Sequence, residues 1–270
     1  MPTTTEPIIE LGWLQVLLLM GMVAIVLGMS LALNLGLVRE FSIATARSIV
    51  QLVAVGLIIG WVFSARTWYW VVGLLLVMTL VAGFTGARRT GVKVPRLGRL
   101  MSVVLAIVTA LTLAYSTIVV LGVRQWDPRY LIPLGGMMLG NAMTAAALAV
   151  ERLTADLKQQ AADVEVLLAL GASPKEAANK ITRSAVRAAL IPTINTMMVV
   201  GIVQLPGMMT GQILGGSDPL QAAMYQFLIL IAIAFCAALS ATAMVRLLQG
   251  RFFTRAWQLD RALLGRLRVP

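Results

Sequence analysis

The chain of 270 residues is 59% hydrophobic and 12% charged, with a mean hydropathy of +0.89. A soluble domain is about half apolar and about a quarter charged, so this composition excludes an ordinary soluble protein and indicates a membrane protein. The net charge of +11 does not indicate a nucleic-acid partner, because the basic residues lie in short loops between apolar spans. One cysteine and no histidine exclude a disulfide framework and a Cys/His zinc site.

Seven segments are long and apolar enough to cross a bilayer core, which requires roughly 20 residues each. They are Gly12–Leu35, Ile43–Phe63, Thr67–Thr85, Leu100–Leu121, Tyr130–Leu153, Ala189–Leu205 and Leu220–Leu248. The first is interpreted as a retained helix, because the residues before it include Glu6 and Glu10 but no Lys or Arg, unlike a signal peptide. The sequence therefore predicts an all-α membrane protein of about seven transmembrane helices, with residues 1–270 forming a single domain.

The distribution of Lys and Arg predicts the orientation of these spans. Four stretches hold 19 of the 22 basic residues, and the opposite side keeps three. The four stretches are Arg39–Arg47, Arg88–Arg99, Arg152–Arg187 and the tail from Arg246. Because basic loops stay in the cytoplasm, we expect the N-terminus outside and the C-terminus in the cytoplasm. The arginine-rich tail is expected to contact anionic lipid.

No acidic or basic residue falls at the middle of a predicted span. Ion-coupled carriers usually place ionisable groups there, so the energy for any transport is expected to come from elsewhere. Asp127 and Asp218 each precede a proline at the start of a span. This pattern is typical of an N-cap followed by a first-turn proline, with a cation exit site as the alternative.

Small and polar residues mark the fifth span, "PLGGMMLGNAMTAAALAV". Gly136, Gly140 and Thr144 form one helical stripe beside Asn141, and such spacing permits close helix packing in lipid. The stripe is consistent with intrachain packing or with a dimer interface or transport path. Polar groups deep in spans should face protein or water. The methionine pairs are a second group of candidate ligands, for which ordinary packing is the alternative. The polar groups and the methionines together give a candidate substrate path of Gln51, Met137, Met138, Asn141, Asn195, Met208 and Met209.

The sixth span is interrupted by helix-breaking residues. Pro192 lies near its start, and Pro206-Gly207 and Gly215-Gly216 follow it. We expect a kinked helix followed by a re-entrant or half-helix piece, with a plain extracellular loop as the alternative.

Between the fifth and sixth spans lies a polar segment, residues 154–188, that carries strong helix-capping signals. Val164, Leu167 and Leu168 give a helix one apolar face, and Gly171 falls where a C′ glycine would end that helix. Ser173, Pro174 and Glu176 then match a capping box with a first-turn proline. The sequence predicts a cytoplasmic helix-turn-helix.

This segment resembles the cytoplasmic signature of importer-type ABC permeases, written EAA, three residues, G, nine residues, I, one residue, LP. Glu165, Gly171 and Ile181 match three anchors in register, whereas Val166-Leu167 and Arg183-Ser184 depart from it. The ATPase-coupling residues implied are Glu165, Gly171, Ser173, Pro174, Glu176 and Ile181.

Five strings across the chain resemble the FetB-type permease family, which includes bacterial permeases implicated in iron export and plant aluminium-sensitivity proteins. They are "SIVQL", "GNAM", "LGASPKEA", "RAALIPT" and "LPGMMTG". The resemblance implies a multi-pass permease subunit of the bacterial plasma (inner) membrane, which forms a homodimer and exports iron or a related metal. It also implies that a separate ABC ATPase docks on Glu165–Lys180.

The chain itself is expected to be no enzyme and to bind no cofactor, because it contains no G-x-x-x-x-G-K-[ST] phosphate loop; ATP and Mg²⁺ would be bound by the partner ATPase. The alternatives are a permease for a nucleotide sugar or other small polar solute, a non-transporting membrane scaffold or sensor, and an independent ion channel.

Overall fold

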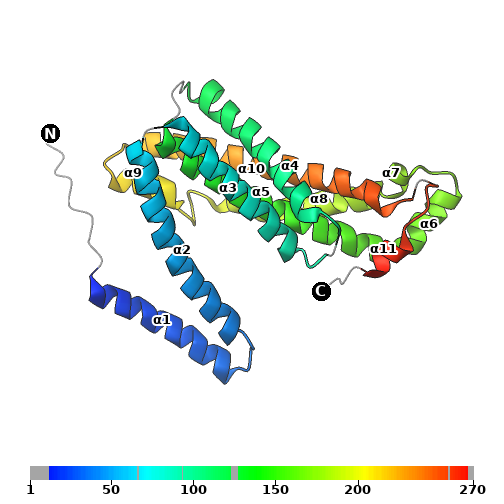
Figure 1. Cartoon of the computed structure of the whole chain (residues 1–270), viewed down its shortest axis with the longest axis horizontal. Helices are drawn as coiled ribbons and strands as arrows, with labels where there is room; N and C mark the ends of the chain where they lie inside the picture. Colours follow the sequence, from blue (N-terminus) through cyan, green and yellow to red (C-terminus); the bar gives the residue numbers. More distant parts are fainter. Residues whose placement is uncertain (1–11, 66, 93, 123–126, 255, 267–270) are drawn as a thin grey trace. The chain divides into compact units, whose positions relative to one another are not determined.

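Helices are the only regular elements of the computed structural model, which describes residues 12–65, 67–92, 94–122, 127–254 and 256–266 (Figure 1). Within these residues the only β-type pairings are two isolated bridges, Val200 with Gln204 and Phe253 with Leu259. The all-α prediction is therefore confirmed for the described chain. The chain divides into two compact units. The first comprises residues 1–66 with 214–216, and the second comprises residues 67–213 with 217–270.

The first unit is a pair of packed helices, α1 (Trp13–Ala32) and α2 (Val38–Ala65). The turn between them is fixed by the Ser30 hydroxyl, which accepts a hydrogen bond of 3.2 Å from the Leu37 amide. The predicted loop at Arg39–Arg47 is wrong, because these residues lie in the first turns of α2. No Gly or Pro interrupts them, and Glu40 in the first turn favours a helix start there.

The second unit is a helical bundle organised around one long helix, α5 (Pro128–Gln159), against which α3, α4, α8 and α10 pack. Its elements, in chain order, are α3 (Trp68–Arg89), α4 (Leu97–Ala114), the π-helical segment η1 (Tyr115–Val120), α5, α6 (Ala161–Ala169), α7 (Pro174–Ala177), α8 (Asn179–Val199), α9 (Gly207–Leu214), α10 (Pro219–Gln249), the 3₁₀ turn η2 (Gly250–Phe252) and α11 (Arg261–Arg266). The core side of α5 is rich in small residues such as Ala142, Ala146 and Ala149, all fully buried.

Helices α3 and α4 approach each other closely at two glycines of α3. A Cβ added at Gly83 would lie 2.1 Å from the Ser102 hydroxyl and 2.6 Å from the Ser102 Cα. A Cβ added at Gly86, one turn on, would lie 2.6 Å from the Met101 sulfur and 2.8 Å from the Met143 Cγ. Glycine is therefore required on this face of α3 for the backbones to approach.

Six helices of the described chain are long and apolar enough to cross a membrane: α1, α2, α3, α4 with η1, α5 and α10 with η2. The predicted sixth span differs, because helix α8 begins at Asn179 and ends at Val199 with Pro192 inside it. Its first half carries Lys180, Arg183 and Arg187, which lowers its mean hydropathy. After a turn at residues 200–206, the eight-residue helix α9 follows, in line with the predicted half-helix piece and not with the plain loop that was its alternative.

Helices α5 and α10 begin at the same end of the bundle. Asp127 caps α5 by accepting from the Arg129 amide at 2.9 Å, and Asp218 caps α10 by accepting from the Gln221 amide at 3.0 Å. Both predicted N-caps are thus confirmed. The rings of Tyr130 and Tyr225 lie 6.2 Å apart, which joins the first turns of α5 and α10. Helix α8 follows α7 directly and packs on both α5 and α10. It therefore runs along these two helices in the direction opposite to theirs.

The opposite end of the bundle, where α3, α5 and α10 end and α4 and α8 begin, is termed the basic end. Arg88, Arg96, Arg152, Lys158, Lys175, Lys180 and Arg246 lie there. The Arg251 guanidinium donates to the Pro95 carbonyl at 3.1 Å, which ties the chain after α10 to the α3–α4 connection. The positive charge is therefore gathered at one end of the second unit.

Candidate functional site

The predicted helix-turn-helix forms at the basic end, as α6 followed by α7 and α8 (Figure 1). Helix α6 ends at Ala169, and Gly171, which follows the C-cap Leu170, has a φ of +91°, a left-handed conformation that L side chains rarely adopt. The Gly171 amide donates to the Leu168 carbonyl and the Ala172 amide to the Leu167 carbonyl, both at 3.0 Å. This pair of bonds is a Schellman motif, so the predicted C′ glycine is confirmed.

Helix α7 starts with the predicted capping box. The Ser173 hydroxyl accepts from the Glu176 amide, and the Glu176 carboxylate accepts from the Ser173 amide at 2.8 Å, with Pro174 in the first turn. The Ser173 hydroxyl also donates to the Glu176 carboxylate at 2.7 Å, and this bond together with the bond from the Ser173 amide lowers the pKa of Glu176. The second helix is shorter than predicted, because the chain leaves α-helical geometry at Ala178 before α8 begins.

Two contacts fix this helix-turn-helix to the bundle. Ile181 is 3% exposed, and Ala177 and Ala178 are buried beside it, so the start of α8 is held by apolar packing. The Gln249 side-chain nitrogen, at the end of α10, donates to the carbonyls of Pro174 and Lys175 at 3.3 and 3.4 Å. Residues 160–181, termed the coupling segment, are thus a positioned element rather than a loose tether.

Glu165 is paired within its own chain. The Arg261 Nε donates to one carboxylate oxygen of Glu165 at 2.7 Å, and the Arg261 Nη2 donates to the other. This hydrogen-bonded pair lowers the pKa of Glu165 and raises that of Arg261. Sequence reasoning assigned the tail arginines to lipid and missed the pair. Asp260, a possible N-cap ahead of Arg261, was a signal that a helix begins there.

The outer surface of α6 is apolar. Val166, Leu167 and Leu170 are 58, 41 and 79% exposed, and we term them the docking patch. A cavity of about 340 Å³ lies beside them, lined by Asp163, Val164, Ile181 and Lys180 among others. Val164 is buried as the predicted apolar face requires, but Leu167 is exposed. An apolar patch at the polar, charged end of a bundle is typical of an interaction surface.

The predicted path residues are divided between the two units. Gln51 belongs to α2 in the first unit, whereas Met138 is fully buried in the second. Asn141 is exposed on α5 and donates to the Met137 carbonyl at 2.9 Å. Asn195 is exposed on α8, and the half-buried Met208 and Met209 lie on α9.

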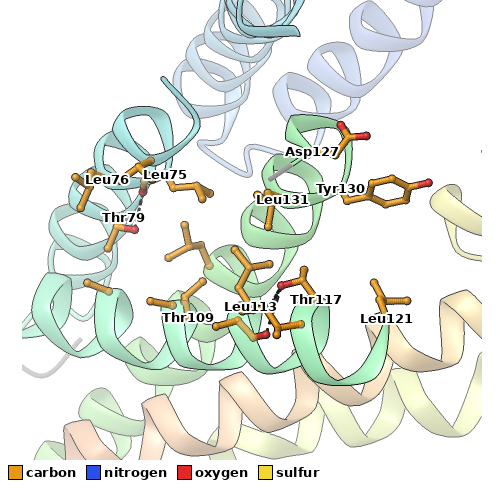
Figure 2. A pocket seen from close by; sticks show the side chains of 16 residues that line it. Leu75, Leu76, Thr79, Thr109, Leu113, Thr117, Leu121, Asp127, Tyr130 and Leu131 are labelled. Atoms are coloured by element: carbon orange, nitrogen blue, oxygen red, sulfur yellow. Dashed lines mark hydrogen bonds between the residues drawn. The ribbon is translucent and has the colours of Figure 1, made fainter. Parts of the chain in front are cut away.

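A cavity of about 290 Å³ lies between α3, α4 with η1, and α5, and Figure 2 shows the side chains that line it. Most are aliphatic. The Thr79 and Thr117 hydroxyls donate to carbonyls of their own helices at 2.7 and 2.8 Å, so these groups are already satisfied. Leu75, Leu113 and Leu131 surround its interior, and no path residue is among its lining.

The described residues contain no group of three or more His, Cys, Asp or Glu side chains that could hold a metal ion. Cys236 is buried near Thr109, with sulfur and oxygen 3.6 Å apart. The single cysteine therefore packs in the bundle core.

Comparison with known proteins gives the family. The model of the uncharacterised protein family UPF0014 matches residues 13–253. A UPF0014 membrane protein of Synechocystis is 38% identical over 93% of this chain and 98% of its own length. The protein ALUMINUM SENSITIVE 3 of Arabidopsis thaliana is 34% identical over 86% of this chain and 84% of its own.

The probable iron export permease protein FetB of Escherichia coli is 31% identical over 84% of this chain and 86% of its own length. No solved structure matches the chain. The protein is a multi-pass membrane protein, and it belongs to the UPF0014 family.

Proposed function

We propose that this chain is the permease subunit of an ATP-driven ABC transporter that exports iron or a related metal. The observation that carries the proposal is the coupling segment: a doubly capped helix-turn-helix, anchored to α8 and α10, with an exposed apolar patch at the basic end. The printed name of the Escherichia coli relative supports a permease and the metal. The sequence contains no phosphate loop, which supports the proposal that a separate chain binds ATP and Mg²⁺.

The proposed topology has seven crossings, with the N-terminus outside and the C-terminus in the cytoplasm of the bacterial inner membrane. Helix α8 supplies the seventh, because it packs on α5 and α10 and its 21 residues extend about 32 Å at about 1.5 Å per residue. The positive charge at the basic end supports its cytoplasmic placement. The coupling segment then lies where a cytoplasmic ATPase can reach it.

In this mechanism the ATPase groove receives the docking patch. Val166, Leu167 and Leu170 supply apolar contact, and the Schellman turn at Gly171 permits close approach of the backbone. Closure of the ATP-bound ATPase dimer would move the coupling segment, and α8 would carry that movement into the membrane because Ile181 anchors the two. Two permeases and two ATPases form the assembly.

The proposed route for metal uses weak ligands. Fe²⁺ favours carboxylate or imidazole, and the described membrane helices offer no cluster of such groups. Amide oxygens of Asn141 and Asn195 and the thioethers of Met208 and Met209 would provide transient contacts. Weak binding suits export, because the ion must leave the site again.

Reconstitution in vesicles with the copurifying ATPase tests the proposal. We expect ATP-dependent movement of Fe²⁺ that needs both chains, with other divalent metals and a UDP-sugar as parallel substrates. Transport of the UDP-sugar alone would show that the substrate is a nucleotide sugar and not a metal. Copurification without flux of any substrate would support a scaffold, and flux without ATP or ATPase would support a channel.

A further inference from the structure

The chain after α10 folds into a defined structure over residues 250–254 and 256–266, which we term the C-terminal arm. Phe252 is fully buried, and the Asp260 amide donates to its carbonyl at 2.8 Å. The Thr254 amide donates to the Gln258 carbonyl at 2.8 Å, and Phe253 bridges to Leu259. The described part of the arm therefore turns back on itself.

The returning part of the arm is anchored by packing and by a helix cap. Leu259 and Leu264 are 7 and 5% exposed. The Asp260 carboxylate accepts from the Leu263 amide at 2.9 Å, which starts α11. This cap places Arg261 at the first position of α11, from which its guanidinium reaches Glu165 on α6.

The contact between Arg261 and Glu165 uses both carboxylate oxygens. A bidentate pair fixes the relative orientation of two groups better than a single bond does. The residues are 96 positions apart in the sequence, so the contact joins separate elements. Because Glu165 is engaged by its own chain, contact with a partner falls to the neighbouring docking patch.

Gln249 makes the second link, from the last residue of α10 to the carbonyls of Pro174 and Lys175 in α7. Gln249 is 5% exposed, so this amide is a buried anchor. Gln249 and Arg261 thus hold α7 and α6 respectively, and both belong to the continuous chain of α10 and the arm.

We propose that the C-terminal arm is a clamp that holds the coupling segment against α10, so that the two move together. Arg261 and Gln249 are its positioning residues. The proposal rests on the proposed function and deepens it: movement of the coupling segment enters the membrane through α10 as well as α8. Glu165 then stabilises a contact within this chain and does not bind the ATPase.

A charge exchange tests the clamp in the isolated permease. We would compare Glu165→Arg, Arg261→Glu and the double exchange, with Arg99→Glu as a control that reverses one exposed charge at the same end. The readout is chymotryptic cleavage of the arm at the exposed Trp257. We expect each single variant to be cleaved about two- to fivefold faster, and the double variant to return to within about twofold of wild type. A double variant cleaved as fast as the single variants would overturn the clamp.

The second readout uses vesicles containing the ATPase and Fe²⁺ as the probe. We expect Arg261→Glu and Gln249→Leu to lower the Fe²⁺ moved per ATP hydrolysed by about two- to fivefold, with the double exchange restoring the loss from Arg261→Glu. If Arg261→Glu moves as much Fe²⁺ per ATP as wild type, Arg261 does not transmit movement to α10, even if the arm of this variant is cleaved faster. ATPase that fails to bind the wild type contradicts the proposed function instead, and the cleavage assay still reports on the clamp.

Discussion

The coupling segment and the interior of the bundle around α5 are specified by different means. In the coupling segment, side chains fix the backbone turn by turn: Gly171 ends one helix, and Ser173 with Glu176 starts the next. In the bundle, residues without a side chain allow two helices to pack closely, as at Gly83 where α3 meets α4. Local capping belongs to an element that must hold its shape in water, and close packing of small residues belongs to helices in lipid.

The largest effect is expected from charge placed in the anchor of the coupling segment. Ile181→Asp buries a carboxylate at a position that is 3% exposed, and should cost at least about 3 kcal/mol and abolish ATPase copurification. The measurement is thermal unfolding in detergent with a pull-down. Lys180→Asp, at the exposed neighbouring position, is the control for unfolding and should stay within about 0.5 kcal/mol of wild type. Equal melting of the two variants would show that Ile181 is no anchor.

Gly83→Ala is expected to destabilise the bundle by about 1–3 kcal/mol, because the added methyl meets the backbone of Ser102 and forces α3 from α4. Gly140→Ala is a matched control on α5, where an added Cβ meets nothing within 4 Å. Thermal unfolding of both proteins measures the difference. A harmless Gly83→Ala would mean that α3 and α4 do not approach as described.

Gly171→Ala tests the other kind of glycine. Space around it is open, as at Gly140, but its φ of +91° strains any L side chain. We expect a loss of about 1–2 kcal/mol, whereas Gly140→Ala should be neutral or slightly stabilising. Hydrogen exchange across residues 165–178 would locate the loss in the turn. The same exchange rates in Gly171→Ala and wild type would argue against the Schellman motif.

The parts of the fold that follow from neighbouring residues could be predicted from the sequence. Asp127 and Asp218 cap their helices, and the turn at Gly171 and the box at Ser173 form as their spacing indicates. Each of these depends on residues within a few positions of one another. The apolar character of six membrane helices was equally evident.

The parts that depend on distant residues could not be predicted. Arg261 and Glu165 are 96 positions apart, and nothing in either neighbourhood names the other. The π-helical segment at Tyr115–Val120 has no sequence signal of its own, so the cavity that it borders was missed. The predicted path gathered polar and methionine residues by type, and residue type alone does not show which side chains line a cavity.

The smallest expected effect is a pH dependence of the clamp. The pKa of Glu165 is lowered in the folded protein, so its contribution to stability is full above the usual glutamate range and is lost as pH falls through the folded pKa. The difference in melting temperature between wild type and Arg261→Gln should therefore narrow between about pH 7 and about pH 4. A difference that stays constant over this range would show that the carboxylate is not the group Arg261 stabilises.

Site-directed cross-linking tests most directly whether an ATPase docks on the coupling segment. The one native cysteine, Cys236, is buried, so a cysteine introduced at Leu170 would be the reactive thiol. We predict that Leu170→Cys cross-links to the ATPase, and that Leu205→Cys, which is 60% exposed at the opposite end of the bundle, does not. Cross-linking at Leu205, or none at Leu170 in a complex that hydrolyses ATP, would contradict the account.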